Sequence, residues 1–150
     1  MIMKAKRYFL LLMLLPFLAI TNVLAQQTIK VVFTYKFAHV SEGMDYVSRM
    51  KVYIDGNLIS TSADNGTSNT YSNTRKETEE NTFSVEFPVG KHILKAMVES
   101  NYKGTWEEHL RANGYSLDCI YEKSMNFTKD VKVKLIFDID TEKVIIVSEE

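Results

Sequence analysis

The stretch IKVVFTYKFAH, residues 29–39, decides the fold class of this chain. Large β-branched and aromatic side chains stand at every second position from Ile29 to Phe37, which is the period of a strand with one buried face. Further segments with strand character follow, at residues 50–54, 82–87, 92–98, 131–137 and 144–147. A succession of short apolar segments of this kind predicts an all-β protein.

Turn signals join these segments into three predicted hairpins. Asp55-Gly56 turns the chain back through residues 57–59. Pro88-Val89-Gly90-Lys91 predicts a hairpin between the third and fourth segments, and residues 138–143 predict one between the last two. With a weaker strand signal over residues 115–127, these features predict an antiparallel β-sandwich of about seven strands, immunoglobulin-like or transthyretin-like.

The segment that follows residues 92–98 contains the signals of one short helix. Thr105 and Glu108 have the spacing of a capping box, in which each side chain bonds to the other residue's backbone amide. Gly114 supplies a left-handed stop. We therefore expect a helix over residues 105–113.

Residues 1–25 have the composition of a removable export signal. Three basic residues lie within the first seven positions, an apolar run of about twelve residues follows, and Val23-Leu24-Ala25 supplies a cleavage site before Gln26. A membrane-spanning helix needs roughly 20 apolar residues, so this run is too short for an anchor. We expect a secreted or periplasmic protein with one domain, residues 26–150, and no stable membrane anchor after cleavage.

Charge and cysteine content narrow the function classes. Three of the 18 basic residues and none of the 19 acidic residues lie in the predicted leader, which leaves 15 against 19 and a net charge of −4. That balance argues against a nucleic-acid partner, because phosphate contacts need a basic surface. Cys119 is the only cysteine, so no disulfide can form within the chain, and we expect a small buried hydrophobic residue there.

Residues 61–81 form a polar segment whose only large apolar side chain is Tyr71. Such a segment cannot bury enough apolar surface to offset the entropy lost on ordering, which predicts a mobile loop. A loop of this length is either a functional excursion or plain disorder, and its composition favours disorder.

One succession of turns and strands resembles known modules. Val52-Tyr53-Ile54-Asp55-Gly56 is followed by Phe87-Pro88-Val89-Gly90-Lys91-His92, and then by apolar side chains at Leu94, Ala96 and Val98. This succession is similar to PEGA domains and to the carboxypeptidase regulatory-like and other immunoglobulin-like modules of bacterial exported proteins. The resemblance implies a β-sandwich that is non-catalytic and serves adhesion, presentation or assembly, an implication that rests on fold analogy.

Two sets of side chains carry donor atoms suited to metals. Alternating carboxylates at Asp138, Asp140 and Glu142 resemble the start of a calcium loop, but the glycine and distal glutamate of such a loop are absent, which favours a solvated turn. Three histidines could form a zinc site, but they stand on separate predicted elements. We therefore expect separate structural roles and no cofactor for His39, His92 and His109.

Three aromatic residues around the predicted helix are the best candidates for a binding surface: Tyr102, Trp106 and Tyr115. Exposed rings with polar neighbours are typical of surfaces that bind a partner. In the competing interpretation, Trp106 lies on the helix face that packs against a sheet and anchors the core. The core interpretation is favoured for Trp106.

The predicted function is that of a secreted or periplasmic, non-enzymatic β-sandwich module. It acts through binding or assembly at the cell surface, with a protein or a glycan as its partner. The alternative is a small secreted hydrolase or metal-dependent enzyme that uses His109 with Glu107 or Glu108. That alternative requires these side chains to converge in one pocket with another polar group.

Overall fold

The structure, a computed structural model, describes residues 26–41, 43–44, 46–62 and 78–150. The export signal predicted for residues 1–25 lies outside the described residues, and so does most of the polar segment, residues 63–77. Within the described part of the chain, no helix has the length and apolar character to cross a membrane.

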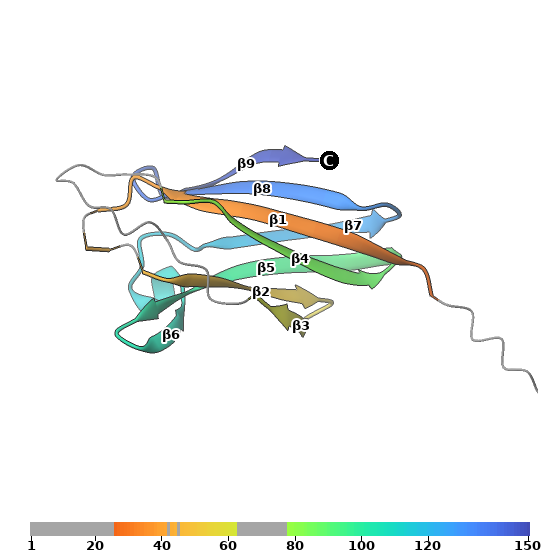
Figure 1. The fold of residues 1–150 in the computed structure, drawn as a ribbon, viewed down its shortest axis with the longest axis horizontal. Helices are drawn as coiled ribbons and strands as arrows, with labels where there is room; N and C mark the ends of the chain where they lie inside the picture. Colours follow the sequence, from red (N-terminus) through yellow and green to blue (C-terminus); the bar gives the residue numbers. More distant parts are fainter. Residues whose placement is uncertain (1–25, 42, 45, 63–77) are drawn as a thin grey trace, which may run out of the picture.

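Nine strands and one short 3-10 helix account for the regular structure of the described residues (Figure 1). The strands are β1 (Thr28–Ala38), β2 (Ser48–Ile54), β3 (Asn57–Thr61), β4 (Asn81–Pro88), β5 (Gly90–Tyr102), β6 (Thr105–Glu108), β7 (Ile120–Phe127), β8 (Val131–Asp138) and β9 (Lys143–Glu149). The 3-10 helix η1 spans Arg111–Asn113, between β6 and β7.

The strands form two sheets, which confirms the predicted all-β sandwich. One sheet has four strands in the order β4-β1-β8-β9, and the other has the order β3-β2-β5-β6 with β7 also paired to β5. In Figure 1, β8 and β9 of the first sheet lie along the upper side of the view and β2, β3 and β6 of the second sheet lie along the lower side. All pairs are antiparallel except β1 with β8, which run parallel in register from Val31 opposite Val131 to Ala38 opposite Asp138.

The core lies between the two sheets and is made by the alternation that the sequence displays. In β1, the large residues at odd positions are all buried, and Phe33 and Tyr35 have no exposed surface. The Phe33 ring meets Tyr121 of the opposite sheet edge to face, with 5.9 Å between centroids. Each fully buried side chain of this size contributes roughly 1.5–3 kcal/mol. Cys119 is completely buried in this core, as predicted.

Two of the three predicted hairpins are confirmed, β2–β3 and β8–β9. The hairpin predicted over Pro88–Lys91 is wrong, because β4 pairs with β1 in one sheet and β5 pairs with β2 and β7 in the other. The chain changes sheets at Val89, whose amide donates to Gln27 O at 2.9 Å. Gly90 follows with φ +144°, and an added Cβ there would lie 3.3 Å from His92 Nε2. Glycine therefore permits the close corner between the sheets.

The helix predicted over residues 105–113 is also wrong. Thr105–Glu108 is the strand β6, which pairs with the end of β5 through a turn at Lys103 and Gly104. Both turn residues have positive φ, 50° and 89°, the geometry that suits a two-residue hairpin. Only the single turn η1 remains of the expected helix, and Gly114 ends it in the left-handed conformation as predicted. The backbone of residues 105–108 therefore forms its hydrogen bonds with β5, and the capping box expected at Thr105 and Glu108 does not form.

Candidate functional site

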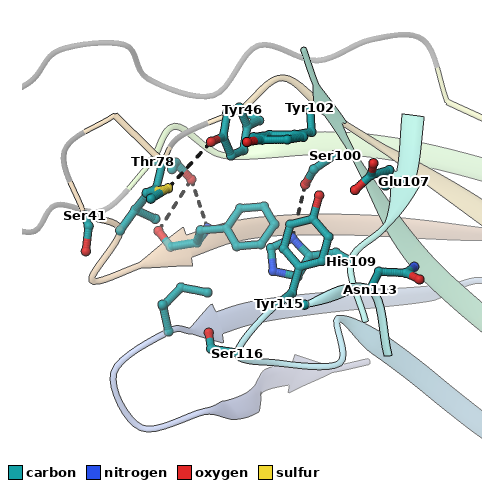
Figure 2. Close-up of a pocket in the computed structure, with 15 residues that line it drawn as sticks. Ser41, Tyr46, Thr78, Ser100, Tyr102, Glu107, His109, Asn113, Tyr115 and Ser116 are labelled. Atoms are coloured by element: carbon teal, nitrogen blue, oxygen red, sulfur yellow. Dashed lines mark hydrogen bonds between the residues drawn. The ribbon is translucent and has the colours of Figure 1, made fainter. Parts of the chain in front are cut away.

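A pocket of about 330 Å³ opens at one end of the sandwich (Figure 2). Its walls come from segments far apart in the sequence: the end of β1 and the residues after it, the end of β5, β6, the turn around Gly114, and Ile139 after β8. The lining includes the side chains of Phe37, Tyr46, Ser100, Tyr102, Glu107, His109, Tyr115 and Ser116.

Aromatic rings form much of the pocket wall. The His109 ring is held between Phe37, at 5.3 Å and 28°, and Tyr115, at 4.1 Å and 31°. Tyr46 and Tyr102 meet edge to face, with 5.3 Å between their centroids. These ring pairs fix one another in place, since stacked and edge-to-face contacts each add to the energy of burial.

His109 is a buried, uncharged side chain. Its backbone amide donates to Val98 O at 2.9 Å, and its Nδ1 lies 3.1 Å from Ser100 Oγ. Burial lowers the pKa of His109 to about 4, because water is lacking around the charged form. At neutral pH the imidazole therefore contributes no positive charge to the pocket.

Oxygen atoms gather opposite the imidazole. Burial raises the pKa of Tyr115, and the Glu107 carboxylate and the oxygens of Tyr46 and Tyr102 raise it further. Figure 2 shows Glu107 on the side of the Tyr115 hydroxyl. Both burial and the negative charge of Glu107 therefore favour the neutral, protonated form of Tyr115.

Two of the three aromatic residues predicted for a binding surface line the pocket, Tyr102 and Tyr115. Trp106 does not. Strand alternation in β6 points Glu107 into the pocket and Trp106 to the outer face of the five-stranded sheet. Trp106 is half-buried and lies outside the hydrophobic core, so the favoured interpretation of this residue as a core anchor is wrong.

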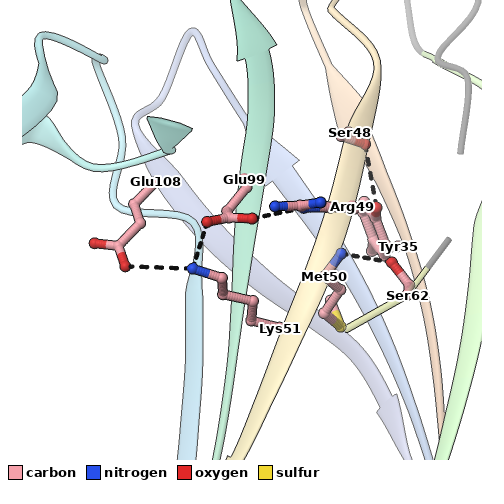
Figure 3. A network of polar contacts seen from close by, with 8 residues as sticks. All are labelled: Tyr35, Ser48, Arg49, Met50, Lys51, Ser62, Glu99 and Glu108. Carbon is pink, nitrogen blue, oxygen red and sulfur yellow. Dashed lines mark hydrogen bonds and ion pairs between the residues drawn. The ribbon is translucent and has the colours of Figure 1, made fainter. Parts of the chain in front are cut away.

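The outer face beside Trp106 carries an ionic network (Figure 3). The Glu99 carboxylate accepts from Arg49 Nε at 2.6 Å and is paired with Lys51, whose Nζ also lies 4.0 Å from Glu108. Burial acts to raise the pKa of Glu99, but the bonds from Lys51 and Arg49 outweigh burial and hold the pKa below its usual value. Glu108 thus belongs to this network, on the other side of the sheet from the pocket.

The three histidines have three different partners. His39 Nδ1 lies 2.8 Å from Asp138 Oδ1, and His92 Nδ1 lies 2.7 Å from Asp55 Oδ2. His109 faces Ser100, as described above. In the stretches that the structure describes, no group of three or more histidine, cysteine or acidic residues is arranged to hold a metal ion.

The carboxylates considered for calcium take part in local structure. Asp138 Oδ1 accepts from the backbone amides of Asp140 at 3.1 Å and Thr141 at 3.3 Å, which is how an aspartate stabilises a turn. Glu142 is paired with Arg111 Nη2 at 3.0 Å. These contacts agree with the turn interpretation of residues 138–142.

Sequence reasoning missed Phe37, Tyr46 and Ser100 as pocket residues. Phe37 was assigned to the core by its alternation, and it contributes to both the core and the pocket wall. Ser100 continues the inward positions of β5, where a small polar residue ends an apolar series. Tyr46 is an aromatic residue in a polar surrounding, a signal that could have drawn attention to it.

Comparison with known proteins identifies no family. No family model matches the chain, and no curated protein sequence matches it. Among solved structures, listeriolysin O is similar over 83% of this chain and 23% of its own, with 13% identity and a TM-score of 0.35. The structure of a disulfide-locked mutant of intermedilysin with human CD59 is similar over 81% of this chain and 24% of its own, with 12% identity and a TM-score of 0.32.

A further structure, described as a Gram negative toxin, has 10% identity and a TM-score of 0.31 over 81% of this chain. The chain spans about a quarter of the length of these toxins. Similarity at this level carries no argument about function. The fold and the pocket themselves define the class: an all-β sandwich with an aromatic pocket at one end.

Proposed function

We propose that this protein is a secreted or periplasmic, non-enzymatic β-sandwich module that binds a partner at the cell surface through the end pocket. The observation that carries the proposal is the pocket itself, about 330 Å³ in volume, with aromatic walls and hydroxyl and carboxylate groups among them. Pockets with apolar walls and a few polar groups are the usual binding sites of folded domains. The partner that we propose is a protein or a glycan.

The surroundings of His109 support a binding role over a catalytic one. A general base works best when its pKa is near the working pH, and burial lowers the pKa of His109 to about 4. The imidazole ring packs against Phe37 and against Tyr115. Of the two glutamates considered as its catalytic partners, Glu108 lies in the ionic network around Lys51. Glu107 remains in the pocket as a charged wall residue.

The test compares two tryptophan variants of the mature protein. Ser116 is exposed and lines the pocket, so Ser116→Trp should obstruct the pocket without entering the core. Ser84 is exposed on β4 and is absent from the pocket lining, so Ser84→Trp is the matched control. Each protein is immobilised and exposed to a glycan array and to an envelope extract of the exporting cell.

We expect the parent and Ser84→Trp to capture the same glycan or protein, and Ser116→Trp to lose it. Capture that survives in Ser116→Trp, with a melting temperature equal to that of the parent, would contradict the pocket as the binding site. Turnover of ester or peptide substrates by the parent would contradict the non-enzymatic assignment.

A further inference from the structure

The geometry points to an ammonium group as the part of the partner that enters the pocket. This inference rests on the proposed binding function and specifies its ligand: a small organic cation, or the cationic end of a larger molecule. It is carried by three observations, namely the charge of the lining residues, the arrangement of the tyrosines and the convergence of their oxygens.

The first observation is the charge of the lining. Glu107 is the only charged side chain among the described residues that line the pocket. His109 also lines it but is uncharged at neutral pH, since burial lowers its pKa to about 4. The described lining therefore has a net negative charge, which favours a cation over an anion such as a phosphate or a carboxylate.

The second observation is the set of three tyrosines. Tyr46, Tyr102 and Tyr115 reach the pocket from three different segments of the chain. The face of an aromatic ring carries partial negative charge and attracts ammonium groups. The chain itself shows this attraction, because the Lys103 ammonium lies 5.0 Å from the centroid of the Tyr102 ring.

The third observation is the convergence of oxygens. The hydroxyls of Tyr46, Tyr102 and Tyr115 and the carboxylate of Glu107 all belong to side chains that line the same pocket. Hydroxyl and carboxylate oxygens can accept hydrogen bonds from a primary ammonium, and aromatic faces can surround a trimethylammonium group. The volume of about 330 Å³ is at the lower end of the range for small-molecule pockets and suits a group of that size.

The experiment uses a pair of probes that differ in charge and not in shape. Choline and 3,3-dimethylbutan-1-ol have the same outline, with a quaternary nitrogen in one and a quaternary carbon in the other. n-Butylammonium is the third probe and separates a primary from a quaternary ammonium. Binding to the mature protein is followed by the chemical shifts of the tyrosine ring protons, and the dissociation constants are compared.

Two variants change the charge near the pocket by one unit in opposite directions. Glu107→Gln removes the carboxylate and should weaken binding of the cations about tenfold or more, the effect of losing a nearby opposite charge and, for n-butylammonium, a hydrogen bond to a charged group. Lys103→Asn removes a competing cation and should strengthen their binding. Asn tolerates the left-handed backbone at this position, where φ is 50°. Neither variant should alter binding of the neutral probe.

Equal affinity for choline and its neutral isostere would overturn the inference, as would unchanged cation affinity in Glu107→Gln with a normal melt. Failure of both cations to bind would overturn it too. The proposed function is judged separately, by the loss of capture in Ser116→Trp. If that loss occurs while the neutral isostere binds as well as choline, the pocket binds an uncharged ligand such as a sugar.

Discussion

The guanidinium carbon of Arg49 lies 4.1 Å from the centroid of the Trp106 ring, on the outer face of the five-stranded sheet. Arg49 also donates from Nε to the Glu99 carboxylate at 2.6 Å. The indole thus covers one side of an ion pair whose acidic member is only 4% exposed. The attraction of a cation to an aromatic face is strengthened when water is excluded from the contact.

Trp106→Ala should lower the free energy of unfolding by about 1–2 kcal/mol, the range of a partly desolvated cation–π contact with some lost apolar burial. Urea denaturation of the two proteins measures it. Trp106→Phe retains an aromatic face and should lose less. A loss above about 3 kcal/mol would be that of a core aromatic residue and would contradict the position described above.

The free energy of unfolding should decrease as the pH is lowered, because of His109. The ordinary pKa of histidine is 6.5 and that of His109 in the folded protein is about 4, so between these values the unfolded chain binds a proton that the folded protein does not. The stability lost as pH falls through this window reaches about 3 kcal/mol, since one pKa unit is about 1.4 kcal/mol.

The measurement compares urea denaturation of the parent and of His109→Gln at several pH values between 7 and 4, the range over which His109 titrates in the unfolded and folded states. The glutamine variant lacks the titrating group but keeps a polar side chain near Ser100. Its stability should depend less on pH than that of the parent. Identical pH profiles, or an imidazole proton resonance that titrates near its ordinary value, would show that His109 is accessible to protons in the folded state.

Replacing residues 64–76 by a short Gly/Ser linker should change the melting temperature little, because Tyr71 is the only large apolar side chain in the segment and the cost of closing a loop changes slowly with length. The cut must spare Ser62 and Thr78. Ser62 Oγ accepts from Met50 N at 2.7 Å, and Thr78 Oγ1 accepts from Phe37 N at 2.9 Å.

Thr78→Ala is the matched comparison for that deletion. It leaves the buried Phe37 amide without its side-chain partner, at a cost of about 1–3 kcal/mol. A deletion that destabilises the protein more than Thr78→Ala would mean that residues 64–76 contribute packing that their composition does not indicate.

The exported protein should begin at or within a few residues of Gln26, where the apolar run ends in small residues. Intact-mass measurement of the protein recovered outside the cytoplasm checks this directly. A mass that includes residues 1–25 would contradict the cleaved signal and indicate a retained segment.

Strands with strict alternation could be predicted from sequence, and those that depend on a choice of partner could not. The buried positions of β1 and β8 follow from their period of two, and the β2–β3 turn follows from Asp55-Gly56, which has φ values of 52° and 82°. Alternation does not reveal which neighbour a strand pairs with. For that reason Pro88–Gly90 was interpreted as a hairpin when it joins two sheets.

The error at residues 105–113 has a local cause. A capping box consists of two residues and is weak unless an apolar stripe follows it, whereas Lys103-Gly104 forms a tight turn that returns the chain along β5. The error also affected the predicted binding surface, because its three aromatic residues were chosen for their positions around the predicted helix. Tyr102 and Tyr115, two of the three aromatic residues predicted for a binding surface, both line the pocket, but their relation to Phe37, Tyr46 and Ser100 arises from segments that only the tertiary fold brings together.

The parallel pair β1–β8 has a consequence for the order of folding. The partners Val31 and Val131 are about one hundred residues apart, and contacts this distant in sequence are slow to form because a long loop must close first. When the chain is synthesised, β1 is made about one hundred residues before β8, the strand that covers one of its edges. The four-stranded sheet therefore cannot be completed until β8 has been synthesised, and on the export route that we propose this delay would keep the chain in a form that can still pass through a channel unfolded.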